Sequence, residues 1–154
     1  MAYKSKGLTY IELLIVLSLL LLFSLSTHRV LMGIILEERM NYSSRVLLQE
    51  LRHLQTKAMA SSRVMEAIFS SKDNNYYYVQ ISPDLRSFKK IILPPGVVIK
   101  RYRIVRGASL SYRFGFRPTG SPTSSGTITL SDTRGRSVTL YLMPSTGRMR
   151  LETN

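Results

Sequence analysis

One acidic side chain, Glu12, lies inside an apolar run that extends from residue 8 to residue 26. At about 1.5 Å per residue this run is about 28 Å long as a helix, which matches the hydrocarbon thickness of a bilayer. A charge in such a segment costs about 2.5 to 3.5 kcal/mol and therefore needs a cationic partner or a function. Cleavage of the basic leader after Gly7 would create an ammonium group on Leu8, about one helical turn from Glu12. We therefore expect an apolar helix with a paired charge near its beginning.

The N-terminal segment resembles that of type IV prepilins and type II secretion pseudopilins. The resemblance rests on Gly7, the hydrophobic Leu8, Glu12 and the apolar residues that follow. The resemblance implies that prepilin peptidase cleaves after Gly7 and methylates the new amine of Leu8. It also implies a filament in which Glu12 of one subunit faces the Leu8 ammonium of the next. Such a buried pair fixes the register of apolar helices more than it stabilises them. An ordinary membrane anchor that never polymerises is the alternative, and it leaves Glu12 unexplained.

The sequence divides into segments of different character. We expect a leader peptide (residues 1–7), a hydrophobic helix for the membrane and the filament core (8–36), and a globular domain (37–154) with an amphipathic helix (37–62) and a β-sheet (63–154). The amphipathic helix is predicted from apolar residues at i, i+4, i+7 and i+11, which are Leu47, Leu51, Leu54 and Ala58. One long helix, embedded in the membrane over residues 8–26 and amphipathic later, is therefore expected.

Beyond Arg63 the apolar residues alternate with a period of two, which is typical of strands with one buried face. Strands are predicted at residues 64–69, 76–81, 89–93, 97–104, 110–114, 127–130 and 137–142. The Gly-, Pro- and Ser-rich stretch at residues 117–126 is predicted as an exposed mobile loop. The predicted fold class is α+β, with a long N-terminal helix packed on an antiparallel β-sheet.

The composition limits the chemistry that the chain can perform. Its 154 residues provide for one anchor and one small domain, and it has no cysteine for disulfides or thiolate metal sites. His28 and His53 lack carboxylates at ligand spacing, so we interpret both as structural and expect no metal or other cofactor. No plausible set of nucleophile, base and orienting acid is present. We therefore expect neither an enzyme nor a small-molecule substrate.

Basic residues outnumber acidic residues by more than two to one. Without Lys4 and Lys6 of the leader, 20 basic residues oppose 9 acidic ones, a formal net charge of +11. From residue 97 onward ten basic residues are opposed only by Asp132 and Glu152, so the surplus is concentrated in the predicted sheet. This pattern favours an anionic partner, such as nucleic acid, lipid headgroups or acidic polymers, over scattered surface charge. A solvated strand face, or contacts with acidic subunits, is the alternative.

The C-terminal part of the chain resembles the C-terminal pattern of the GspH/FimT family of minor pilins and pseudopilins. The resemblance is carried by residues 116–120, 126–130, 136–140 and 146–150. Members implicated in natural transformation bind DNA through a Gly-Arg-x-Arg segment, so the resemblance implies DNA binding by Arg148 and Arg150. Arg134 and Arg136 have the same spacing, and we expect all four to line one groove. Two arginines two residues apart on an extended segment can contact successive phosphates.

The expected DNA binding is mainly electrostatic and independent of sequence. Six tyrosines offer rings for stacking on unpaired bases, although packing within strands is the commoner role of this residue: Tyr76, Tyr77, Tyr78, Tyr102, Tyr112 and Tyr141. Stacking is therefore not expected to be the main source of affinity.

The resemblance implies a minor type IV pilin that takes up DNA in natural transformation. Its expected partners are prepilin peptidase, other pilins or pseudopilins, the membrane and DNA. It would cross the cell membrane once, with the globular domain outside the cytoplasm, until it enters the pilus. The alternative is a GspH-like minor pseudopilin of a type II secretion system, with a structural role in the pseudopilus.

Overall fold

A single long helix, α1 (Tyr10–Ser61), begins the fold. The structure is a computed structural model that describes residues 9–69, 74–81, 87–106, 109–144 and 147–153, without the side chains of residues 24–30, 106 and 109–111. Ser62 adopts a left-handed conformation with a φ of 53°, which ends the helix. The chain forms two compact units, Met1–Ile35 and Leu36–Asn154, and α1 contributes residues to both.

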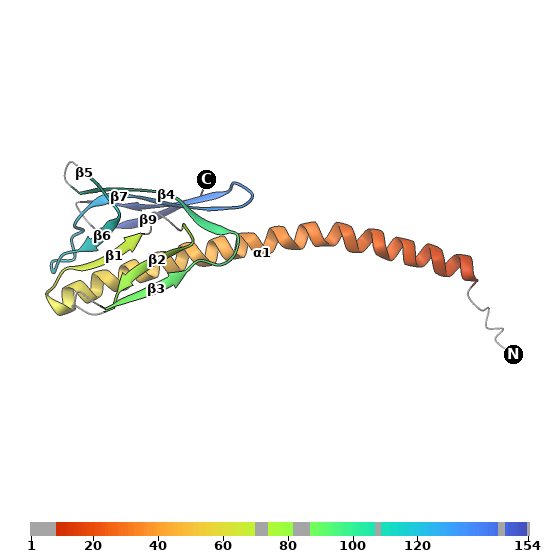
Figure 1. Cartoon of the computed structure of the whole chain (residues 1–154), viewed down its shortest axis with the longest axis horizontal. Coiled ribbons are helices and arrows are strands. Elements are labelled where there is room, and N and C mark those ends of the chain that lie inside the picture. Colours follow the sequence, from red (N-terminus) through yellow and green to blue (C-terminus); the bar gives the residue numbers. More distant parts are fainter. Residues whose placement is uncertain (1–8, 70–73, 82–86, 107–108, 145–146, 154) are drawn as a thin grey trace. The chain divides into compact units, whose positions relative to one another are not determined.

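Nine strands follow α1 in the described part of the chain. They are β1 (Met65–Phe69), β2 (Tyr76–Gln80), β3 (Phe88–Ile92), β4 (Val97–Arg106), β5 (Ser109–Ser111), β6 (Arg113–Phe116), β7 (Ser125–Asp132), β8 (Ser137–Leu142) and β9 (Met149–Thr153). They form a four-stranded sheet in the order β3-β2-β1-β6 and a five-stranded sheet in the order β5-β4-β7-β8-β9, with every pairing antiparallel. The predicted α+β class, with a long helix packed on antiparallel strands, is confirmed (Figure 1). The expected single sheet is instead two sheets.

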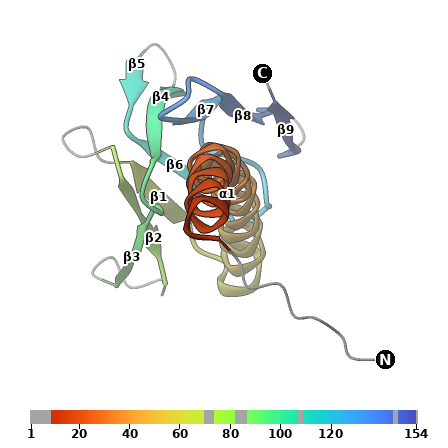
Figure 2. The ribbon, with the colours of Figure 1, turned by 90° about the vertical axis from the view of Figure 1, so that its right-hand side faces the viewer.

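The apolar stripe of α1 lies at the centre of the core. Leu47, Leu51, Leu54 and Ala58 are each at most 1% exposed, as predicted. Apolar residues of both sheets pack in the same cluster, including Phe69 of the four-stranded sheet and many residues of the five-stranded sheet. Figure 2 shows the two sheets on adjoining sides of this part of α1, with β1, β2 and β3 at its left and β4, β7, β8 and β9 above it. Burial of each large apolar side chain contributes about 1.5 to 3 kcal/mol.

The core is complete within one of the two units. Its described buried residues run from Met40 to Leu142, and Met149 and Leu151 pack against it. All of these residues lie in the unit Leu36–Asn154. This unit therefore has its own hydrophobic core and does not depend on residues 1–35 for it.

Residues 117–126 match the prediction of an exposed loop only in part: Arg117, Pro118 and Thr119 are exposed, and the last two residues belong to β7. Gly120, Pro122 and Ser124 are buried, because the segment folds back against the domain. The side-chain amide Nε2 of Gln55 donates a hydrogen bond to the carbonyl oxygen of Gly120 (2.8 Å). Pro122 also forms an isolated bridge with Phe116. Small residues permit this close approach, so the composition that suggested an exposed loop here produces a packed turn.

Two strand predictions need correction. The single strand expected at residues 110–114 is divided at Tyr112 into β5 and β6, which belong to different sheets. β9 was not predicted, although Met149 and Leu151 alternate as strand residues do. They pair with Leu142 and Leu140 of β8, and both pack against the core. The last two residues of the Gly-Arg-x-Arg segment, Met149 and Arg150, therefore begin an edge strand, and Gly147 and Arg148 precede it.

Candidate functional site

Gly147 fixes the path of the chain into β9. Its φ is 65°, which glycine adopts without strain. A Cβ atom at this position would lie 2.9 Å from Nε2 of Gln55 and 3.0 Å from the carbonyl oxygen of Gly120. The N–H of Gly147 donates to the carbonyl oxygen of Met143 (3.2 Å), which closes the turn after β8. The positive φ and the nearness of the Gly120 carbonyl oxygen together favour glycine here, and the turn brings Arg148 next to α1.

Arg148 lines an open hollow of about 570 Å³ beside α1. The other lining residues are Gly147, Met149 and three residues of α1, namely Arg52, Gln55 and Thr56. Among the described residues that line this hollow, two are arginines and none is acidic, so it favours an anionic group such as a phosphate. Arg52 was not among the candidate residues predicted from the sequence, because nothing in the local pattern indicates that it meets the β8–β9 connection.

Arg150 lies elsewhere on the domain surface. It pairs in register with Tyr141 of β8, whose neighbours Leu140 and Leu142 point into the core. Arg150 is exposed, on the face of the sheet that points away from α1. The structure therefore places Arg148 beside the helix and Arg150 on the outer face of the sheet.

The turn between β7 and β8 is organised around the buried carboxylate of Asp132, whose side chain is 0% exposed. Its Oδ1 accepts hydrogen bonds from the backbone N–H groups of Arg134 (2.9 Å) and Arg136 (3.0 Å), and its Oδ2 accepts one from Nε of Arg136 (2.9 Å). Burial alone would raise the pKa of the Asp132 carboxyl, but the hydrogen bonds from Arg136 and Arg134 outweigh it and hold this pKa below its usual range.

Arg136 has a second carboxylate partner. Its Nη1 lies 2.9 Å from Oε2 of Glu37 on α1, so the guanidinium links the β7–β8 turn to the helix within the same unit. The Arg136 guanidinium, which two carboxylates hold in place, therefore stabilises the turn. Arg136 was predicted to bind DNA because its local spacing matches that of Arg148 and Arg150.

The two arginine pairs lie at opposite ends of β8. Arg134 and Arg136 precede this strand, whereas Arg148 follows the turn after it. Six strand residues at about 3.3 Å each separate the two ends by at least about 17 Å. The four arginines therefore do not line the single groove expected from the sequence.

Glu12 lies in the first turn of α1, and it is exposed. The described apolar side chains around it are also exposed, from Tyr10 to Phe23. Gly7 and Leu8, the residues expected at the cleavage site, lie outside the described residues. Among the residues whose side chains are described, no helix combines the length and apolar character needed to cross a membrane.

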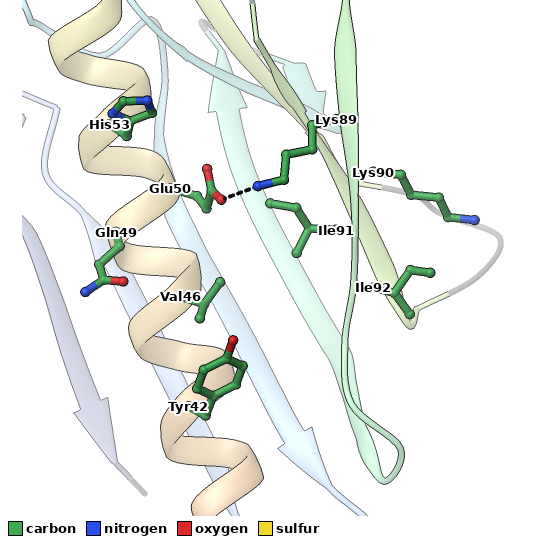
Figure 3. Close-up of a pocket in the computed structure, with 9 residues that line it drawn as sticks. All are labelled: Tyr42, Val46, Gln49, Glu50, His53, Lys89, Lys90, Ile91 and Ile92. Atoms are coloured by element: carbon green, nitrogen blue, oxygen red, sulfur yellow. Dashed lines mark hydrogen bonds and ion pairs between the residues drawn. The ribbon is translucent and has the colours of Figure 1, made fainter.

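A second hollow, of about 580 Å³, lies between α1 and the edge strand β3 (Figure 3). Tyr42 and Val46 of α1 and Ile91 and Ile92 of β3 supply its apolar lining. A salt bridge of 3.1 Å between Glu50 and Lys89 crosses the hollow. This site was not predicted from the sequence, although a signal was present: Tyr42 and Val46 lie beside the core stripe of α1, and Ile91 and Ile92 are consecutive apolar residues in a strand.

His53 lines the same hollow and is exposed. The side chain of His28 lies outside the described residues. Within the described ranges, no group of three or more His, Cys, Asp or Glu side chains is placed to hold a metal ion.

The fold is similar to that of a known protein. No protein-family model matches the sequence, and a comparison with curated proteins gives no sequence match. Among solved structures, the chain is similar to the minor pseudopilin EpsH from the type 2 secretion system of Vibrio cholerae. The TM-score is 0.54 at 12% sequence identity, and the match covers 75% of this chain and 97% of EpsH.

The likeness shows the class of fold. A long N-terminal helix packed on antiparallel sheets is the pilin-like fold, and this chain has it. The match includes nearly all of EpsH, so it concerns the whole architecture of that protein and not a single motif.

Proposed function

We propose that this chain is a minor pilin of the GspH/FimT kind that is processed by prepilin peptidase and assembled into a type IV pilus. Cleavage after Gly7 exposes the amine of Leu8, and residues 8–26 hold the subunit in the membrane before assembly. In the filament, Glu12 pairs with the Leu8 ammonium of a neighbouring subunit. The observation that carries this proposal is a pilin-like fold whose long helix has a lone carboxylate in its first turn.

The second candidate is a minor pseudopilin of a type II secretion system. The similarity to EpsH favours it, because EpsH is such a protein. At 12% identity the similarity reflects the fold, which pilins and pseudopilins share. The basic surface favours the first candidate. Its globular domain would bind duplex DNA through phosphate contacts, without reading base edges.

Within this proposal, Arg148 is the main contact with duplex DNA. It lines an open hollow together with Arg52, and both side chains would contribute positive charge to the binding of a phosphate there. Arg150 contributes from the outer face of the sheet, and Arg134 adds charge at the far end of β8. Arg136 supports the β7–β8 turn through Asp132 and Glu37.

Retention of duplex DNA by the unit Leu36–Asn154 tests this function. Because each phosphate that the protein neutralises contributes about 0.9 to the slope of log K against log salt, the double change Arg148→Ala and Arg150→Ala should reduce that slope by about 2. Affinity at low salt should fall at least about tenfold. The measurement is retention of a labelled duplex in a gel or on a filter at several salt concentrations.

A matched control removes the same charge elsewhere. Arg45→Ala with Arg63→Ala changes two exposed arginines, on and just after α1, that do not line the hollow of Arg148. This control should keep most of its affinity for the duplex. Unchanged retention in the Arg148 and Arg150 variant would exclude these residues from the site, and no retention by the unchanged domain at low salt would exclude DNA binding.

A further inference from the structure

The outer face of the five-stranded sheet carries two rows of polar side chains that cross four strands. Register places the members of each row side by side on β4, β7, β8 and β9. The first row is Arg103, Thr127, Tyr141 and Arg150, and the second is Arg101, Thr129, Thr139 and Glu152. A short hydrogen-bonding distance of 3.1 Å between the hydroxyls of Thr129 and Thr139 shows that side chains of the same row meet on the same face.

These rows point away from the core. The residues that alternate with them, including Ile104, Ile128 and Leu140, are buried. Arg101, Arg103 and Arg150 are exposed. The rows therefore form a surface that is separate from the hollow where Arg148 meets α1.

The charge of this surface is strongly positive along β4. A bulge between Ile99 and Arg101 leaves both Lys100 and Arg101 exposed, so β4 presents three cations within four residues. Glu152 is the one acidic residue in the two rows. Cations thus lie at both sides of the face, on β4 and on β9, about 14 Å apart across three strand spacings.

The strands between these cations carry a different set of groups. β7 and β8 contribute the hydroxyl side chains of Thr127, Thr129 and Thr139. Thr127 and Thr129 are partly exposed, whereas Thr139 is buried and shares a hydrogen bond with Thr129. Tyr141 is the one aromatic residue of the two rows and is partly exposed. Tyr77 and Tyr102, by contrast, stack on Phe69 at 5.7 and 6.4 Å between ring centroids. Tyr141 is therefore placed between cations on a surface that a polymer chain can approach.

We propose that this outer face binds single-stranded DNA, with phosphates on the β4 cations and Arg150 and an unpaired base stacked on Tyr141. The inference rests on the proposed DNA-binding function and names a ligand and a surface for it. Single-stranded sites of this kind combine cations that follow the backbone with aromatic rings that stack on bases. A duplex keeps its bases paired and offers none to Tyr141. The face therefore binds a single strand more tightly than a duplex of the same length, without base-edge readout.

The chain contains no tryptophan, so Tyr141→Trp introduces a single fluorescent reporter on this face. The full chain, purified in detergent, is titrated with a poly-thymidine oligonucleotide and with a duplex of equal length. The single strand should quench the tryptophan emission at lower concentrations than the duplex does. Absence of quenching by the single strand would overturn the proposal.

Further variants test the β4 arginines and Tyr141 separately. Fluorescence anisotropy of a labelled oligonucleotide measures the binding. Arg101→Thr with Arg103→Thr should raise the dissociation constant for the single strand at least about tenfold at low salt and reduce the salt slope by about 1.4. Tyr141→Thr should raise this constant about fivefold or more, whereas Tyr141→Phe should leave it unchanged. The Arg45→Ala and Arg63→Ala control should change it little.

The outcomes separate this inference from the proposed function. If the variant Arg101→Thr with Arg103→Thr keeps its affinity for the single strand, the outer face is not the site. The same conclusion follows if the control Arg45→Ala with Arg63→Ala loses as much affinity as that variant. If duplex retention still depends on Arg148 in that case, the proposed function stands and this inference fails. Binding of neither form of DNA at low salt would overturn both. Equal affinity for single strand and duplex, with no effect of Tyr141→Thr, would overturn the preference for a single strand.

Discussion

Glu12→Ala is expected to reduce the amount of this subunit in filaments at least about 100-fold. In the proposed filament, this change would leave the Leu8 ammonium without its partner in an apolar core, and breaking a buried ion pair in this way costs about 3 to 5 kcal/mol. Each 1.4 kcal/mol corresponds to a factor of about ten in an equilibrium constant. The measurement is the amount of subunit in sheared filaments relative to the membrane fraction, by immunoblot.

The control for this experiment is Glu38→Ala, which removes another exposed acidic residue of α1. It should enter filaments as the unchanged chain does. Normal incorporation of Glu12→Ala would contradict the pairing with Leu8. Absence of the unchanged chain from all filaments would support the alternative of an anchored protein that does not polymerise.

Asp132→Ala is expected to lower the free energy of unfolding of the unit Leu36–Asn154 by about 2 to 4 kcal/mol. The change leaves two backbone N–H groups of the β7–β8 turn without their acceptor and removes a buried partner of Arg136. Urea unfolding at neutral pH, followed by circular dichroism, measures the difference. A decrease of less than about 0.5 kcal/mol, typical of a surface substitution, would contradict this account of the turn.

The same carboxylate should make the stability depend on pH. The folded state lowers the pKa of Asp132, so its contribution is present above the pKa of about 3.9 in the unfolded chain and is lost as the pH falls through the lower folded-state value. The unchanged domain should therefore lose stability below about pH 4, and Asp132→Asn should remove part of this loss. Urea unfolding of both proteins at several pH values measures this difference.

The helix and most strands could be predicted because their signals are local. Leu47, Leu51 and Leu54 show the helical period directly in the sequence, and all three are buried. The division of the strands between two sheets could not be predicted in this way, because it depends on which distant strands pair. The chain changes sheets at Tyr112, between β5 and β6, where the sequence shows one continuous alternating run.

The candidate site was predictable only in part, for a related reason. The Gly-Arg-x-Arg pattern identifies Arg148 and Arg150, but local spacing does not show which face each arginine occupies. Arg136 meets Glu37 from 99 positions away in the sequence, and no local pattern indicates that contact. A match in spacing therefore gave Arg136 and Arg150 the same expected role, whereas long-range packing gives them different environments.

The mass of the native protein tests the central claim most directly. The account predicts a mature chain that begins at Leu8, lacks residues 1–7 and carries a methylated amine. Mass spectrometry of the intact protein, purified from the membranes of cells that have prepilin peptidase, measures this. A native product that still carries the first seven residues could not form the pair between Leu8 and Glu12, and it would contradict the proposed assembly into a filament.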